Sequence, residues 1–293
     1  MTRRIGIVGF GEAGSSIAAG LVKEGAEVVA TDARLDTPAG DELRRRAEEG
    51  SVALVASIAE VVPEADVVLS LVTANAAEPV AKALAGHVAE GQLVADLNST
   101  SPGLARRVGE ILAPSGASFV DVSVMAAVPP NGHRVPMLAS GPDAARFVEL
   151  ATDLGMQVEL VGEEIGAASA VKMLRSLLVK GLEVLLLDAC LAADRYGATE
   201  RVLTSMNGGL PMHDWQELAT YLLGRTAQHA ERRGHELEEA AATLEELGMD
   251  PGVPHAGARR LLWAASQGLQ ERFGSRLPDH YDEVLDALQG DSR

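Results

Sequence analysis

Three glycines near the amino terminus have the spacing of a phosphate-binding turn. Gly9, Gly11 and Gly14 follow an apolar run and precede a helical pattern of small residues. The first glycine permits a tight bend, the second lets backbone approach a pyrophosphate, and the third lets the helix pack on the strand. The phosphates then lie on unpaired N–H groups at the positive helix end. The sequence therefore predicts a dinucleotide site, with a ligand-free turn as the alternative, and the expected binding residues are Gly9, Phe10, Gly11, Glu12, Ala13 and Gly14.

A carboxylate follows at the distance expected for ribose binding. Asp32 ends the next apolar run, eighteen residues after Gly14. It would accept hydrogen bonds from a free 2′-hydroxyl and repel a 2′-phosphate, which favours NAD. Arg34 lies two residues further on and could fold over a phosphate, so NADP is disfavoured rather than excluded.

A lysine in the middle of the chain is the candidate for proton transfer. Lys172, Ser176 and Glu183 fall within about 40° of one another on a long apolar helix, with Arg175 and Lys180 on the flanks. A lysine near apolar surface and beside another cation has a lowered pKa, which suits proton exchange with an alcohol or carbonyl oxygen. The alternative is a solvated stripe in which Lys180 and Glu183 pair at the surface, and the pattern alone slightly favours it.

Alternating strands and helices are expected to position these residues. The predicted strands cover residues 4–9, 27–31, 52–55, 65–72, 93–97 and 118–122, and the predicted helices cover residues 15–23, 41–49, 78–85 and 102–112. Buried strands alternating with helices imply a Rossmann-type, doubly wound parallel sheet, which is an α/β fold. Ligands bind beyond the carboxyl ends of such strands, so Thr73, Ala74, Asn98 and Ser99 are expected to contact the cofactor. Helix capping before Pro102 is an equally good explanation of the serines there.

The rest of the chain is predicted to be helical. Residues 165–193 form one apolar helix of roughly 45 Å that joins two domains. Helices over residues 215–231, 235–247 and 257–273 follow. We therefore expect a dinucleotide-binding domain over residues 1–162 and an all-α domain over residues 163–293 for substrate binding and dimerisation. Arg225, His229 and Arg232 share a helical face, and an exposed ion-pair face or subunit contact is preferred there over a clamp for an anionic substrate.

Composition excludes several classes of partner. A net charge of −17 argues against nucleic acid and anionic membranes, which are bound mainly through Lys and Arg. Neither a signal segment nor an apolar stretch of membrane-spanning length is present, so a cytoplasmic location is expected. The single cysteine, Cys190, is interpreted as a small buried side chain. No His/Cys/Asp cluster has metal-ligand spacing, so no metal is expected.

Four segments together resemble one enzyme superfamily. The glycine turn and residues 96–102, 121–141 and 166–176 occur in the order seen in the β-hydroxyacid dehydrogenase and 6-phosphogluconate dehydrogenase superfamily. The carboxyl-terminal part resembles its DUF1932 branch, through Trp215, Tyr221, Arg225, His229, Arg232, Arg233 and Glu236. This resemblance implies that Lys172 is the catalytic lysine and that Ser99 and Thr100 line the nicotinamide and substrate site.

The chain departs from the family where the substrate would bind. The family usually has a Ser-Gly-Gly stretch that holds a carboxylate, and Met125-Ala126-Ala127 stands there, after Ser123. The asparagine four residues after the lysine is Ser176. These changes point away from 6-phosphogluconate and 3-hydroxyisobutyrate. Arg175 could bind a carboxylate beside an apolar wall, and the expected substrate-binding residues are Ser123, Met125, Ala126, Arg175 and Ser176.

The resemblance implies an NAD(P)-dependent oxidoreductase acting on CH–OH. We expect hydride transfer between nicotinamide and a secondary alcohol or ketone, such as a β-hydroxy acid with an apolar portion, with Lys172 as general acid and base. Imine reduction is an alternative, although those enzymes commonly place Asp or Tyr at the lysine position. A non-catalytic dinucleotide sensor or scaffold is a third reading, favoured by the lost Ser-Gly-Gly stretch. Helical domains of this superfamily commonly pair, so a homodimer is expected.

Overall fold

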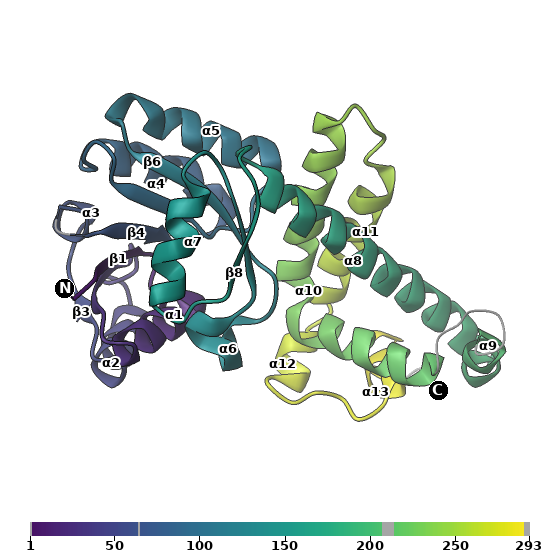
Figure 1. Ribbon diagram of the computed structural model, residues 1–293. Coiled ribbons are helices and arrows are strands. Elements are labelled where there is room, and N and C mark those ends of the chain that lie inside the picture. Colours follow the sequence, from purple (N-terminus) through teal and green to yellow (C-terminus); the bar gives the residue numbers. More distant parts are fainter. Residues whose placement is uncertain (1, 64, 207–213, 290–293) are drawn as a thin grey trace. The chain divides into compact units, whose positions relative to one another are not determined.

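The chain folds into two compact units. In the computed structural model, residues 2–63, 65–206 and 214–289 are described, apart from the side chains of residues 188 and 192 (Figure 1). The units are Met1–Lys172 and Met173–Arg293. The domain boundary expected after residue 162 precedes this division by ten residues and stays a prediction.

The first unit is built on an eight-stranded sheet in the order β3-β2-β1-β4-β5-β6-β7-β8. Its strands are β1 (Arg4–Val8), β2 (Glu27–Thr31), β3 (Ala53–Leu54), β4 (Val67–Ser70), β5 (Leu93–Asp96), β6 (Ser118–Val124), β7 (Met137–Ser140) and β8 (Val158–Gly162). The predicted doubly wound sheet is confirmed, with one difference: β7 runs antiparallel to β6, while the other pairs are parallel. The link between β6 and β7 holds only the short helices α6 (Val128–Asn131) and η2 (Gly132–Arg134), instead of the helical crossover typical of parallel strands.

Helices cover both faces of this sheet (Figure 1). They are α1 (Glu12–Lys23), α2 (Gly40–Gly50), α3 (Ile58–Val61), α4 (Ala74–Ala85), α5 (Pro102–Leu112) with η1 (Ala113–Ser115), and α7 (Ala144–Asp153). Ile17 of α1 and Phe147 of α7 lie in one hydrophobic core, and Leu84 of α4 and Leu112 of α5 lie in another. Two covered faces explain why most residues of the central strands are apolar on both sides of the sheet.

The described part of the second unit contains helices and no strand, as predicted. The helix α8 (Ala167–Asp194) begins in the first unit and continues into the second, followed by α9 (Thr199–Met206), α10 (Trp215–Glu246), α11 (Gly252–Ala265), α12 (Leu269–Phe273) and α13 (Tyr281–Gln289). Leu187, Leu223 and Leu285 belong to its core. Across the described residues, no helix is long and apolar enough to cross a membrane.

Two helix boundaries differ from the prediction. The two helices expected over residues 215–231 and 235–247 are one helix, α10, which is kinked at His229 (φ −139°, ψ 19°). The single helix expected over residues 257–273 is divided into α11 and α12. Gly268 lies between them with a φ of +74°, a conformation that glycine adopts readily and that ends a helix.

Candidate functional site

The predicted phosphate-binding turn connects β1 to α1. Gly9 has a φ of +99°, and a Cβ atom added there would lie 2.3 Å from the carbonyl oxygen of Leu71. A Cβ atom on Gly14 would lie 2.1 Å from the carbonyl oxygen of Gly9. Neither position has room for a side chain, so the tight strand-to-helix turn requires glycine at both. The first N–H groups of α1 have no acceptors within the helix, and this fits a bound pyrophosphate.

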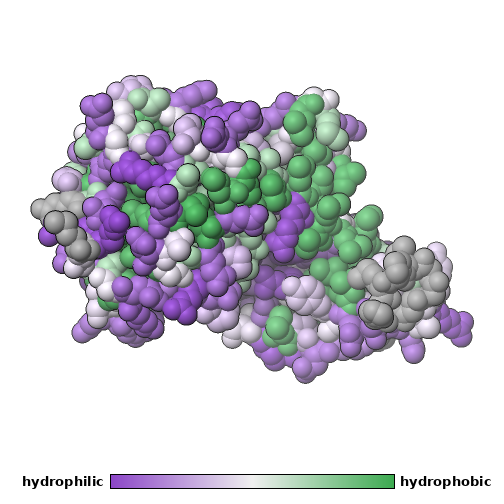
Figure 2. Space-filling view, viewed as in Figure 1, coloured by the Kyte–Doolittle hydropathy of each residue, from purple (hydrophilic) through white to green (hydrophobic). Residues whose placement is uncertain are grey.

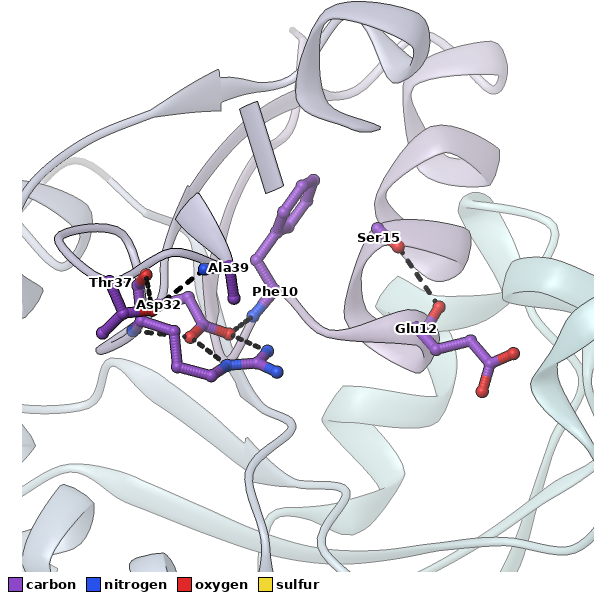
Figure 3. Close-up of polar contacts among 7 residues, drawn as sticks. Phe10, Glu12, Ser15, Asp32, Thr37 and Ala39 are labelled. Atoms are coloured by element: carbon purple, nitrogen blue, oxygen red, sulfur yellow. Dashed lines mark hydrogen bonds and ion pairs between the residues drawn. The ribbon is translucent and has the colours of Figure 1, made fainter. Parts of the chain in front are cut away.

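Asp32 lies beside this turn, with its carboxylate buried. It accepts hydrogen bonds from the backbone N–H groups of Phe10 (2.8 Å) and Arg34 (2.9 Å) (Figure 3). The Arg34 side chain binds the same carboxylate in bidentate fashion, through Nε at 2.9 Å and a terminal nitrogen at 2.8 Å. Although burial raises the pKa of Asp32, the hydrogen bonds from Arg34 and Phe10 outweigh it and hold that pKa below its usual value. The carboxylate expected to bind ribose is therefore an ionised group that is already engaged with Arg34.

A row of buried polar side chains crosses four adjacent strands. Ser70 of β4, Asp96 of β5, Asp121 of β6 and Ser140 of β7 are register partners of one another in that order, and all four are buried. Side chains paired in register lie on the same face of a sheet. We call these four residues the polar row. Ser70 and Asp96 are also the last residues of their strands, so the row lies where a doubly wound sheet binds ligands.

Asp121 attaches the start of α8 to the sheet. Its carboxylate accepts hydrogen bonds from the N–H groups of Gly166 (3.1 Å) and Ser169 (3.0 Å), and from the hydroxyls of Ser169 (2.7 Å) and Ser140 (3.1 Å). The Ser140 oxygen in turn accepts from the N–H of Ala168 at 3.0 Å. Two strands therefore cap the amino terminus of α8. Sequence reasoning missed this role of Asp121, although an aspartate within an apolar strand is a usable signal.

Lys172 lies three residues after Ser169, so the two are neighbours on α8. Its charge acts on Asp96, the neighbour of Asp121 in the polar row. The pKa of Asp96 is raised to about 7, mainly by burial and further by Asp121, while the N–H of Asn98 and the charge of Lys172 oppose the rise. The predicted catalytic lysine thus interacts with a buried carboxyl group that titrates near neutral pH.

Asn98 connects the ends of two strands. Its side-chain oxygen accepts a hydrogen bond from the N–H of Val72 at 2.6 Å, and its side-chain nitrogen donates to the Ser70 hydroxyl at 3.0 Å. Its backbone N–H donates to Asp96 at 3.2 Å. The amide is therefore used within the protein, and the cofactor contact expected of Asn98 stays a prediction.

The capping alternative is confirmed at Ser101, one of the serines before Pro102. Its hydroxyl caps α5 by accepting a hydrogen bond from the N–H of Leu104 at 3.3 Å. Thr73 is the residue before α4, which begins at Ala74, and its side chain makes no cap hydrogen bond. Capping therefore does not explain Thr73, and the cofactor contacts expected of Thr73 and Ala74 stay predictions.

Two hydroxyls in the first unit are buried without a partner in the described part of the chain. They belong to Ser99, after β5, and to Ser123 in β6. An unpaired buried hydroxyl costs about 1–3 kcal/mol, and a bound ligand can supply the missing partner. Both residues were predicted to contact cofactor or substrate, and this observation fits that role.

The other expected substrate-binding residues are divided between the two units. Met125 is partly buried and its N–H donates to the carbonyl oxygen of Pro136 at 2.8 Å, while Ala126 is exposed. Arg175 and Ser176 belong to the part of α8 assigned to the second unit. Their contact with a substrate stays a prediction.

The prediction that Lys180 and Glu183 pair at the surface is wrong, because both side chains are buried and bind residues of α10 instead. The Lys180 ammonium lies 2.8 Å from a carboxylate oxygen of Glu236. Glu183 forms an ion pair with Arg233 and accepts a hydrogen bond from Thr226 at 2.6 Å. Burial lowers the pKa of Lys180, although Glu236 opposes it. The apolar surroundings of these charges make partners on α10 necessary.

The expected exposed ion-pair face is confirmed at Arg232, which binds Glu236 at 2.5 Å and is itself exposed. Arg225 and His229 are partly buried. Cys190 is buried as expected, and burial raises its pKa to about 11. Among the residues that the structure describes, no three His, Cys, Asp or Glu side chains are arranged to hold a metal ion.

Two regions of the sequence match known families. Residues 4–147 match the NAD-binding domain of 6-phosphogluconate dehydrogenase, and residues 193–263 match a domain of unknown function, DUF1932. The first region contains the glycine turn, Asp32 and the polar row, and the second contains the helix kink at His229.

Proteins similar over nearly the whole chain have also been solved. A conserved hypothetical protein from Sinorhizobium meliloti 1021 is 38% identical, with a TM-score of 0.80 and coverage of 98% of this chain and 96% of that chain. A conserved protein of unknown function, described as structurally similar to 3-hydroxyacid dehydrogenases, is 32% identical, with a TM-score of 0.71 and coverage of 92% and 97%. A further relative is similar over part of the chain. It is an L-threonate dehydrogenase from Cupriavidus necator, which is 35% identical over 188 residues, with coverage of 61% of this chain and 60% of that enzyme.

Proposed function

Because the chain belongs to the family that joins the NAD-binding domain of 6-phosphogluconate dehydrogenase to a DUF1932 domain, we propose that it is an NAD(P)-dependent dehydrogenase. The reaction is hydride transfer between nicotinamide and a secondary alcohol or ketone. The substrate class is a β-hydroxy acid or a related compound with an apolar portion. The similarity to an L-threonate dehydrogenase supports a hydroxy acid, and the partly buried Met125 supports the apolar portion.

Lys172 is the proposed general acid and base. The observation that carries this role is its position on α8, three residues after the Ser169 that binds Asp121, in the same unit as the glycine turn. Lys172 takes the hydroxyl proton during oxidation and donates a proton to the carbonyl oxygen during reduction. Nicotinamide, when bound, supplies or accepts the hydride. The attachment of α8 to Asp121 limits the movement of the helix that carries the lysine.

NAD is the proposed preferred cofactor. The buried carboxylate of Asp32 would accept hydrogen bonds from ribose hydroxyls and repel a 2′-phosphate. The Arg34 side chain already donates hydrogen bonds to the Asp32 carboxylate, so this side chain must move before ribose can bind there. The same guanidinium could bind a 2′-phosphate, so NADP is disfavoured as a cofactor rather than excluded.

A Lys172→Met variant tests the assignment. We expect cofactor binding to be retained and turnover to fall about 10²–10⁴-fold, because only the proton transfer is removed. Turnover is measured on a panel of 3-hydroxy acids, aryl or branched β-hydroxy compounds and ketones, with NAD and NADP in both directions. Lys82→Met, at an exposed position on α4, is the matched control and should behave as wild type. Near-normal turnover of Lys172→Met would contradict the role.

A non-catalytic dinucleotide sensor is the second candidate. The observation in its favour is Met125-Ala126-Ala127, which offers no hydroxyl where the superfamily usually holds a substrate carboxylate. Deuterium tracing separates the two functions. A dehydrogenase transfers deuterium from [4-²H]NADH into a product of the ketone panel, and a sensor transfers none.

A further inference from the structure

We infer that Asp96 is a positioning residue for Lys172: its buried carboxylate stabilises the Lys172 ammonium group and thereby sets the pH range in which this lysine exchanges its proton. The use of that proton in hydride chemistry rests on the proposed function. The coupling between the two side chains does not, so the two ideas can fail separately.

The first step concerns how the two carboxylates of the polar row differ. Asp96 and Asp121 are register partners on adjacent strands, and both are buried. Asp121 accepts four hydrogen bonds, three of them from the first turn of α8. Within the described part of the chain, the Asp96 carboxylate forms hydrogen bonds only with Asn98, through the backbone N–H at 3.2 Å and through the Asn98 side chain. The Asp121 carboxylate is therefore occupied by the helix cap, while the carboxylate oxygens of Asp96 can accept further hydrogen bonds.

The second step concerns the approach of α8 to this pair. Ser169 donates to Asp121, and Lys172 lies three residues further along the same helix, so the lysine is adjacent to the residue that binds the row. Asp96, the neighbour of Asp121, feels the charge of Lys172. The register of the sheet and the cap of α8 thus bring the Lys172 ammonium group to Asp96, the carboxylate of the row that accepts fewer hydrogen bonds.

The third step concerns charge. Burial and the neighbouring Asp121 raise the pKa of Asp96 to about 7, and Lys172 and the N–H of Asn98 oppose this rise. Electrostatic coupling is reciprocal, so an ionised Asp96 raises the pKa of Lys172. Above about pH 7 the ionised carboxylate therefore favours the ammonium form, the form that can protonate a carbonyl oxygen. Below that pH the carboxyl group of Asp96 is protonated and neutral, so it no longer stabilises the ammonium form of Lys172.

The coupling can be measured without any substrate. The chain has four lysines, so ¹³C incorporated at the ε carbon of lysine gives few signals, and Lys172→Met assigns the relevant one. We expect Asp96→Asn to lower the titration midpoint of Lys172 by about one pH unit or more. Asp66→Asn, at an exposed carboxylate just before β4, is the matched control and should leave it unchanged. The wild-type signal should also show a second inflection near pH 7, where Asp96 titrates.

Each outcome decides the inference. A folded Asp96→Asn protein with an unchanged Lys172 midpoint overturns it. If that variant does not fold, the wild-type signal decides alone: a second inflection near pH 7 that Asp66→Asn retains supports the coupling, and a single titration step overturns it. Where the coupling is present but Lys172→Met keeps normal turnover, the inference stands and the proposed function fails.

The same variant gives a kinetic readout once a substrate is known. Oxidation needs the neutral amine and reduction needs the ammonium, so both pH profiles should move to lower pH in Asp96→Asn. A merely structural role would lower the rate at every pH without moving the profile. A profile that stays in place therefore counts against the inference.

Discussion

At the scale of single residues, Asp32 and Arg34 bind each other where a cofactor ribose would have to compete for the carboxylate. We expect Arg34→Ala to strengthen NAD binding by about threefold, because the Arg34 side chain is half exposed and its ion pair with Asp32 is therefore weak. NADP binding should weaken by about tenfold, through loss of a charge-assisted contact to phosphate. Cofactor fluorescence titration measures both constants, with Arg45→Ala on α2 as the control. Unchanged NADP affinity would show that Arg34 does not contact the 2′-phosphate.

Asp96 also predicts how stability depends on pH. Its pKa rises from an ordinary 3.8 to about 7 on folding, so the folded state binds the extra proton between these values. The stability contributed by its neutral form is complete below about pH 4 and is lost as pH rises to about 7. We expect Asp96→Asn to gain roughly 2 kcal/mol on wild type between pH 5.5 and pH 8. Urea denaturation at both pH values measures this, and a constant difference would contradict it.

The sequence predicted those site residues whose partners lie close by in the chain. Gly9, Gly14 and Asp32 belong to one strand–turn–helix–strand segment, where spacing determines geometry. The polar row could not be predicted in the same way, because Asp96 and Asp121 meet only through the register of two strands. The cap of α8 depends likewise on the pairing of a distant strand with its first turn.

At the scale of elements, α8 and α10 are joined by the buried ion pair of Glu183 and Arg233. We expect Arg233→Met to destabilise the protein by about 3–5 kcal/mol, because it leaves the Glu183 carboxylate buried without its cation. The double variant Glu183→Leu with Arg233→Met should recover most of this loss, since no unpaired charge remains. Chemical denaturation of both variants tests the pair. Equal losses in the two would show that packing, rather than charge, holds these helices together.

Element types were easier to predict than element limits. The long helix α8 was predicted almost to its ends, because apolar residues without proline continue for several turns. Strand β7 was not predicted, since Met137, Leu138 and Ala139 are residue types that favour helices over strands. A break was predicted between residues 231 and 235 from glycine punctuation, but α10 continues through this stretch and is kinked at His229 instead, with buried residues on both sides of the kink.

At the scale of the whole molecule, we propose a homodimer formed through α8. Leu174, Leu178 and Leu185 are 41%, 75% and 69% exposed and share one face of that helix. Figure 2 shows hydrophobic surface along the course of α8. A two-fold interface uses the same patch on both copies, so a leucine stripe of this kind can pack against itself. Leu178→Glu should then give a monomer in light scattering at micromolar concentration. Leu247→Glu, at a leucine that is 62% exposed outside this stripe, should leave the assembly intact. A monomeric wild type would overturn the proposal.

The cap of α8 also has a consequence for the order of folding. The first turn of a helix usually forms with its N–H groups open to water, but here Gly166, Ala168 and Ser169 donate to side chains of β6 and β7. Those acceptors are separated from the turn by 28 to 48 residues, so their contacts require closure of long loops. The amino-terminal turn of α8 should therefore become stable only after β6 and β7 have paired. Lys172 should therefore reach its position beside Asp96 late in folding, after the sheet that contains Asp96 has formed.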